Sequence, residues 1–156
     1  AHFPGTGFAE EVGREDGAGY TVNVPLRAGD GDAAVRLAFD SLILPLARAY
    51  KPQLILVSAG YDGERGDPLG GLNFSRSAFR WMAGTLRELA EELGAAGPVC
   101  FLEGGYVPAM LAASVKATLE GLAGDEGEFS PVPTAQERED VEATLMALRP
   151  YWPGVL

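Results

Sequence analysis

The chain has 156 residues, 47% of them hydrophobic and 22% charged, which is enough for one globular domain with a sizeable core. Its formal net charge of −10 argues against a basic surface for nucleic acid; it fits either a cationic substrate or partner, or simple solubility. The single cysteine excludes an internal disulfide, and no apolar run approaches the ~20 residues that span a membrane. With no secretory leader in sight, we expect a cytoplasmic protein that binds neither nucleic acid nor membrane.

The first half of the chain predicts a strand, a helix and a second strand. Apolar and polar residues alternate over residues 20–26, which is typical of a strand. A helix follows over residues 32–49; Asp32 is suited to cap it, and Pro45 predicts a kink because it removes one backbone donor. The apolar run 54–57 then predicts a buried strand.

The second half predicts three more helices and one strand. In chain order these are a helix over 75–93 that ends at Gly94, a strand over 99–102, a helix over 108–122, a linker over 124–133 and a helix over 134–148. Cys100 lies inside the strand, where we expect it to act as a small buried hydrophobe. Thr134 and Glu137 have the spacing of a capping box.

This alternation of strands and helices predicts an α/β fold, with a mostly parallel sheet and helices on both faces. Three strands make a narrow sheet. Its free edge would be open to pairing with another strand, so we expect a partner there.

One acidic residue lies where α/β proteins bind ligands. Asp62 follows the apolar run 54–57 within the stretch SAGYDGERGDPLGG. Ligands bind beyond the carboxyl ends of parallel strands, so Asp62 is a candidate metal ligand or catalytic group. The alternative is an aspartate that caps a turn.

A second candidate follows the strand over 99–102. Glu103 and two glycines precede Tyr106 in the stretch LEGGY. Two glycines let the backbone turn sharply beside a ligand, and a phenol at the same rim as Asp62 would be able to donate a hydrogen bond to a developing oxyanion. The alternative for Tyr106 is a half-buried aromatic residue that packs on the next helix.

Together these stretches resemble the zinc-dependent histone deacetylase family, which includes deacetylase-like amidohydrolases and acetylpolyamine amidohydrolases. The resemblance rests on HFPGTG, GYTVNVPL, SAGYDGERGDPLGG and LEGGY, in this order over residues 1–123. It implies part of an arginase/deacetylase-type fold in three pieces: a carboxyl-terminal part of the catalytic domain (1–123), a linker (124–133), and a terminal helix and tail (134–156) that pack on that domain.

The resemblance also implies roles for the two candidates. Asp62 matches the family's last zinc ligand, which closes a site of two aspartates and one histidine. Tyr106 matches the tyrosine that donates a hydrogen bond to the substrate carbonyl. Asp67 matches a further part of the loop motif, to which we assign no chemistry, because an Asp-Pro step is explained by turn geometry.

Further roles concern the walls of the substrate channel. Phe3 matches an aromatic residue on one wall, Leu69 an apolar residue on the rim, and Gly104 and Gly105 the glycines of the floor. Tyr20 matches a position where some relatives offer a backbone carbonyl to a structural potassium ion.

In the family, a histidine pair and an Asp-x-His motif lie upstream of the PGTG loop, whereas this chain has one histidine, His2. We therefore expect the carboxyl-terminal half of an enzyme that hydrolyses acetyl-lysine or acetylpolyamine amides, inactive and without tight zinc binding as an isolated chain. The expected partners are an amino-terminal half or another copy, through the sheet edge. The alternative function is a non-catalytic binding module of the same fold.

Overall fold

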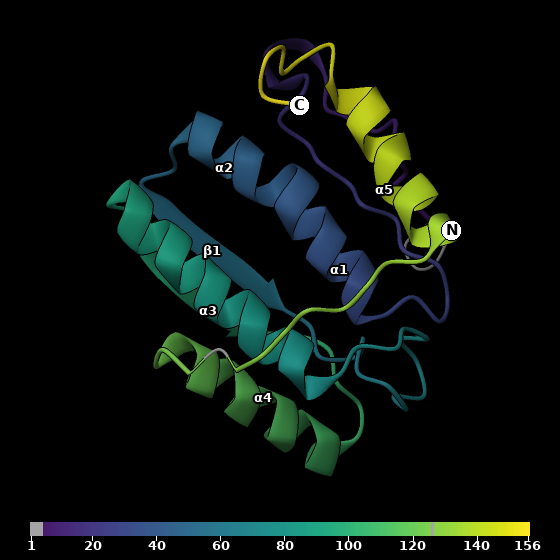
Figure 1. The fold of residues 1–156 in the computed structure, drawn as a ribbon, viewed down its shortest axis with the longest axis vertical. Helices are drawn as coiled ribbons and strands as arrows, with labels where there is room; N and C mark the ends of the chain where they lie inside the picture. Colours follow the sequence, from purple (N-terminus) through teal and green to yellow (C-terminus); the bar gives the residue numbers. More distant parts are fainter. Residues whose placement is uncertain (1–4, 126) are drawn as a thin grey trace.

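The computed structural model describes residues 5–125 and 127–156 (Figure 1). Its elements in chain order are η1 (Glu15–Gly17), α1 (Asp32–Ala38), η2 (Phe39–Ile43), α2 (Leu44–Tyr50), β1 (Leu54–Ala59), α3 (Arg76–Leu93), β2 (Ala96–Leu102), α4 (Pro108–Leu122) and α5 (Ala135–Leu148). Within these ranges no helix is long and apolar enough to cross a membrane.

The sheet consists of β1 and β2, which run parallel and are joined through α3. Val57 pairs with Cys100 and Ala59 with Leu102, so both strands end at the same edge of the sheet. This confirms the predicted α/β class with a parallel sheet.

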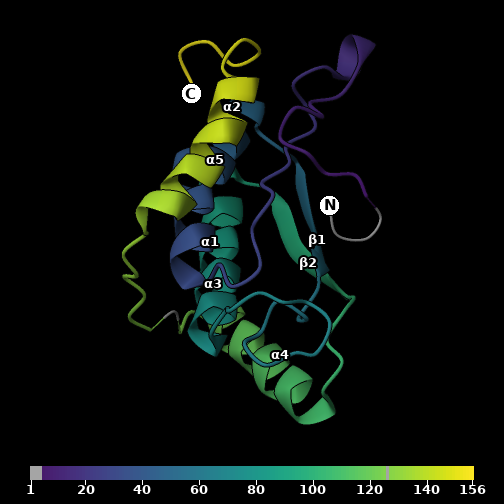
Figure 2. The ribbon, with the colours of Figure 1, turned by 90° about the vertical axis from the view of Figure 1, so that its right-hand side faces the viewer.

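In the part of the chain that the structure describes, one face of this sheet is covered and the other is open, so the predicted helices on both faces are not found there (Figure 2). Figure 2 shows α1, α3 and α5 on one side of the two strands. Ile55 and Val57 of β1 are partly buried, whereas the alternate residues Leu54 and Leu56 are exposed, as are Val99 and Phe101 on the same face of β2. In parallel sheets both faces are normally buried, so this open face is an unusual apolar surface.

The strand predicted over residues 20–26 is wrong. Residues 20–27 carry no regular structure, because no strand of the described sheet pairs with them. Side chains satisfy part of this backbone instead: the Thr144 hydroxyl of α5 donates to the carbonyl of Asn23 at 2.8 Å. The Asn23 amide in turn donates to the carbonyls of Phe8 and Glu11.

The helix predicted over residues 32–49 is present with one irregularity. A π-helical turn, η2, interrupts it and ends two residues before Pro45, whose ring would clash with a carbonyl one turn earlier in a regular α-helix. The predicted cap is wrong: Gly31 is the N-cap of α1. The Asp32 carboxylate instead accepts from the backbone N–H and the hydroxyl of Ser75, at 2.7 and 2.6 Å.

The remaining helices confirm their predictions. α3 begins after Ser75 and ends at Gly94, which adopts the left-handed conformation with φ of 65°. Thr134 and Glu137 form the predicted capping box of α5.

Two apolar clusters hold the helices in place. The first joins α1, η2 and α3 to the loops after β1 and before α5 through Val35, Phe39, Tyr61, Phe74, Phe79, Trp81 and Phe129. In the second, Val141 and Leu148 of α5 pack on Ala38, Leu42 and Leu46. The loops at the ends of β1 and β2 therefore rest on a fixed helical layer.

Candidate functional site

Glycines surround the carboxylate of Asp62 in the loop after β1. A Cβ atom placed on Gly104 would lie 2.6 Å from Oδ1 of Asp62, and one placed on Gly60 would lie 3.0 Å from the same atom. Among the residues that the structure describes, no hydrogen bond or ion pair engages this half-buried carboxylate. Its oxygens are therefore free to bind a metal ion or to accept a hydrogen bond.

Backbone bonds join the loop of Asp62 to the loop of Tyr106. The Glu103 N–H donates to the Ala59 carbonyl at 3.0 Å, and the Tyr61 N–H donates to the Gly104 carbonyl at 2.8 Å. The parallel pairing of β1 and β2 thus continues beyond the strand ends. The two candidate residues lie on adjacent loops at the same edge of the sheet.

The phenol of Tyr106 is not packed into the core. Its residue is 54% exposed, directly before the first turn of α4 at Pro108. In residues 5–125 and 127–156 the phenolic oxygen has no hydrogen-bond partner. Tyr106 is thus available to a ligand rather than half-buried against the next helix.

Asp62 also borders an open groove of about 780 Å³. Most of its lining is apolar and comes from the segment before α1, from α1 and η2, and from the loop after β1: Val24, Leu26, Val35, Ala38, Ile43, Leu72 and Phe74. Tyr106 does not line this groove. The structure therefore joins the two loops but does not place both side chains in one cavity.

Neither Gly104 nor Gly105, the two predicted floor glycines, has room for a Cβ atom. Gly104 leaves room for the Asp62 carboxylate. Gly105 has φ of +130°, and a Cβ atom there would lie 2.9 Å from Cδ1 of Leu111. Leu69, the predicted rim residue, is 58% exposed.

The two remaining predicted site residues are Phe3 and Tyr20. Phe3 lies outside the described residues, as does the single histidine, His2. Tyr20 packs edge-on against Tyr50 and Trp152, with ring centroids 5.9 and 5.5 Å apart, beside a groove of about 330 Å³. The structure does not bring Tyr20 to the Asp62 loop.

Sequence reasoning missed the contacts of Asp67. Its carboxylate accepts from the N–H groups of Leu69, Gly70 and Tyr106, at 2.9, 3.3 and 2.8 Å. Desolvation raises the pKa of this carboxyl, but the bonds from Tyr106, Leu69 and Gly70 outweigh it and lower the pKa below the usual value of 3.8. The Asp-Pro-Leu-Gly stretch signals the turn, whereas nothing in the local sequence signals the bond to Tyr106.

Glu64 was missed as well. This glutamate of the same loop is only 6% exposed, and it accepts from the Ser114 hydroxyl of α4 at 2.6 Å and from Nε of Arg76 of α3 at 3.0 Å. The loop of Asp62 is thereby fastened to two helices. Both partners are remote in sequence, so no local pattern predicts the contact.

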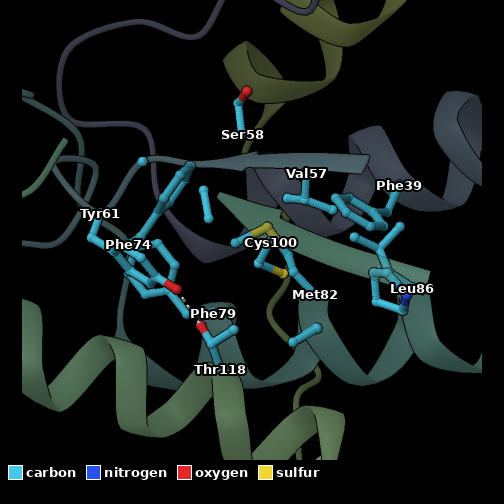
Figure 3. A pocket seen from close by; sticks show the side chains of 14 residues that line it. Phe39, Val57, Ser58, Tyr61, Phe74, Phe79, Met82, Leu86, Cys100 and Thr118 are labelled. Carbon is cyan, nitrogen blue, oxygen red and sulfur yellow. Dashed lines mark hydrogen bonds between the residues drawn. The ribbon is translucent and has the colours of Figure 1, made fainter. Parts of the chain in front are cut away.

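A second cavity, of about 230 Å³, lies between the sheet and α3. Figure 3 shows Val57 and Cys100 of the strands facing Met82 and Leu86 of α3 across it, while Ser58 points to the other side of β1. Cys100 is exposed, so its predicted burial is wrong, although partial burial raises the pKa of its thiol. The apolar lining offers no carboxylate for a metal.

The described part of the chain holds no group of three or more histidine, cysteine, aspartate or glutamate residues able to bind a metal. A catalytic zinc ion normally takes three protein ligands. The unpartnered carboxylate of Asp62 suits one of them. The described residues therefore offer one candidate ligand for such an ion.

Comparison with known proteins gives the site a context. A family model described as "Histone deacetylase domain" matches residues 1–122. Histone deacetylase 10, chloroplastic, of Oryza sativa subsp. japonica is 47% identical over 123 residues, which are 79% of this chain and 28% of that protein. Polyamine deacetylase HDAC10 of Homo sapiens is 39% identical over 151 residues, covering 92% of this chain and 22% of that protein.

Solved structures agree with the sequence comparison. The crystal structure of the HDA15 HD domain superposes with a TM-score of 0.89 at 34% identity, covering 99% of this chain and 42% of that one. The structure of the histone deacetylase Clr3 gives a TM-score of 0.88 at 31% identity, over 97% of this chain and 26% of that one. The chain thus spans less than half the length of each of these relatives.

Proposed function

Since this chain belongs to the histone deacetylase family, we propose that it supplies part of the active site of a zinc-dependent amidohydrolase acting on acetylated lysine or acetylated polyamines. The observation that carries this proposal is the carboxylate of Asp62, which no described residue engages and which glycines keep accessible. The adjacent loop carries Tyr106, whose phenol is exposed.

Each residue has a distinct task in the proposed mechanism. Asp62 would hold zinc, which when bound polarises an acyl carbonyl and a water molecule. Tyr106 donates its phenolic hydrogen bond to the carbonyl oxygen as negative charge develops there, and Leu69 and Phe3 flank the apolar stem of the substrate. The remaining zinc ligands and the general base would be histidine and aspartate residues beyond those that the structure describes.

The proposal includes the inactivity of this chain on its own. We expect the purified chain to bind zinc with far less than one ion per molecule, and to leave an acetyl-lysine peptide and an acetylpolyamine intact. Zinc content by mass spectrometry of the desalted protein and release of acetate measure both. Robust turnover by the chain alone would contradict this part of the proposal.

The complete gene gives a direct test of the enzyme itself. We expect it to encode a His-His pair and an Asp-x-His motif after apolar strands. A gene without them would favour a protein that binds acylated partners without hydrolysing them.

Tyr106→Phe tests the proposed donor in the complete gene product. Loss of one such donor lowers kcat by about 10²–10³. Tyr50→Phe is a matched control, because Tyr50 is also exposed and lies on α2. Turnover of Tyr106→Phe at the wild-type rate would remove this residue from the mechanism.

Three further proposals concern the surroundings of the site. The free edge of the sheet would pair with the amino-terminal part of the enzyme or with another copy, and a clean monomer in sedimentation of the chain would count against this. The backbone carbonyl of Tyr20 would bind potassium, which predicts a higher thermal midpoint of the complete gene product in potassium than in sodium chloride. A cytoplasmic location is testable by microscopy of a tagged protein.

A further inference from the structure

Asp67 connects the two loops that carry the proposed catalytic groups. Its Oδ1 accepts from the N–H groups of Leu69 and Gly70, two and three residues further along its own loop. Its Oδ2 accepts from the N–H of Tyr106, 39 residues away, at 2.8 Å. The two oxygens therefore have different partners: one closes a local turn, and the other reaches the neighbouring loop.

Turn geometry accounts for only the two hydrogen bonds that Oδ1 accepts. An aspartate that bonds to N–H groups two and three residues ahead is a common turn device, and asparagine serves equally well there because its carbonyl oxygen also accepts. The bond to Tyr106 needs a second acceptor on the same side chain. A carboxylate has one and a carboxamide does not.

Asp67 bonds to the backbone of Tyr106 and not to its side chain. The Tyr106 phenol has no hydrogen-bond partner in the described residues, and the preceding Gly105 has φ of +130°. Its hydroxyl lies at the end of a long rigid side chain, so a small rotation of the backbone displaces it by a larger amount. The position of the Tyr106 backbone therefore determines which positions the phenolic hydroxyl can occupy.

We propose that Asp67 is a positioning residue, which fixes the Tyr106 phenol relative to Asp62 by holding the Tyr106 N–H. This inference rests on the proposed function for its catalytic consequence. Displacing a catalytic group by about 1 Å typically costs on the order of 10²-fold in rate.

Asp67→Asn separates the two roles of the side chain. The asparagine carbonyl can keep the turn bonds to Leu69 and Gly70, while its NH₂ group faces the Tyr106 N–H and repels it. Asp30→Asn is the control, because Asp30 also accepts from a backbone N–H of its own turn, that of Arg27, and does not contact Tyr106.

The first measurement is amide hydrogen exchange of the full chain by NMR and needs neither metal nor activity. A hydrogen bond to a charged group stabilises by an amount that corresponds to roughly 10- to 100-fold in exchange rate. We expect Asp67→Asn to accelerate exchange of the Tyr106 amide by this factor, with Leu69 and Gly70 unchanged and Asp30→Asn without effect on Tyr106. Equal exchange of Tyr106 in wild type and Asp67→Asn would overturn the inference.

The second measurement is a double-mutant cycle in the complete gene product with an acetyl-lysine peptide. Asp67→Asn should lower kcat by about 10- to 100-fold with KM and zinc content little changed. Combined with Tyr106→Phe it should add almost no further loss, because the group that it positions is already gone. A full additional loss in the double variant would show that Asp67 acts elsewhere and would overturn the inference.

The two arms distinguish the inference from the function on which it rests. A wild-type gene product without deacetylase activity refutes the proposed function. In that case the exchange rate of the Tyr106 amide alone tests the hydrogen bond between Asp67 and Tyr106. If Asp67→Asn does not fold, Asp67→Glu offers two acceptors at a longer reach. Partial protection of the Tyr106 amide in that variant supports the inference, and exchange as fast as in an unfolded chain contradicts it.

Discussion

Adding one methyl group at Gly104 tests whether this glycine exists to make room for the Asp62 carboxylate. In Gly104→Ala the new Cβ would lie 2.6 Å from Oδ1 and 2.7 Å from Cγ of Asp62. Ordinary contact begins near 3.4 Å, so the carboxylate must retreat by roughly 0.8 Å. Gly104 does not have a positive φ, so the crowding is the main penalty.

The expected change in the free energy of unfolding is the sum of two opposing contributions. Overpacking costs about 2 kcal/mol, the middle of the usual range. Replacing glycine by alanine stabilises by about 0.4–1 kcal/mol through the unfolded chain. We therefore expect Gly104→Ala to lower the free energy of unfolding by about 1 kcal/mol, or roughly 2–4 °C in Tm for a domain of this size.

A double-mutant cycle isolates the contact. Asp62→Ala removes the carboxylate, and in that background Gly104→Ala should be neutral or stabilise by up to about 1 kcal/mol. Urea unfolding followed by circular dichroism measures all four proteins, and Gly17→Ala is the control because a Cβ atom there meets nothing within 4 Å. Equal destabilisation by Gly104→Ala in both backgrounds would refute the reasoning.

Three other predictions concern contacts described above. Ser114→Ala leaves the buried Glu64 without one donor and should lower the free energy of unfolding by about 1–3 kcal/mol in urea titrations; an unchanged midpoint would show that water replaces the hydroxyl. Thr134→Ala removes the capping box of α5 and should cost about 1 kcal/mol by the same assay, whereas Thr134→Ser should restore most of it. Because the pKa of Asp67 is lowered below 3.8, its bond to the Tyr106 N–H persists above that pH and is lost as the pH falls through the lowered pKa, so the Tyr106 amide resonance should move only at strongly acid pH; a midpoint above pH 4 would contradict this assignment.

The sequence predicts the helices well because their signals are local. Gly94 ends α3 and the pair Thr134 and Glu137 begins α5, as their patterns indicated. The alternation over residues 20–26 misled because a strand also requires a neighbour, and the described sheet offers none there. Local pattern is sufficient for an α-helix, whose hydrogen bonds are internal, and insufficient for a strand.

The residues of the candidate site also differ in whether their contacts can be predicted from the sequence. Asp62 and Tyr106 were found from their places after apolar runs, and the structure sets their loops side by side. Asp32 was assigned to its own helix, whereas it bonds to Ser75, 43 residues away. Asp67 was assigned to its own turn, which explains only one of its two oxygens. For a short acidic side chain, the local partner is visible in the sequence and the distant one depends on the fold.

The open face of the sheet also affects how the stability of this chain is measured. Leu56 and Phe101 are each more than half exposed there. Only folded chains present these residues together, so any self-association through them draws the folding equilibrium toward the native state. Unfolding midpoints should then rise with protein concentration, and a dilution series is needed before any difference between variants is assigned to folding alone.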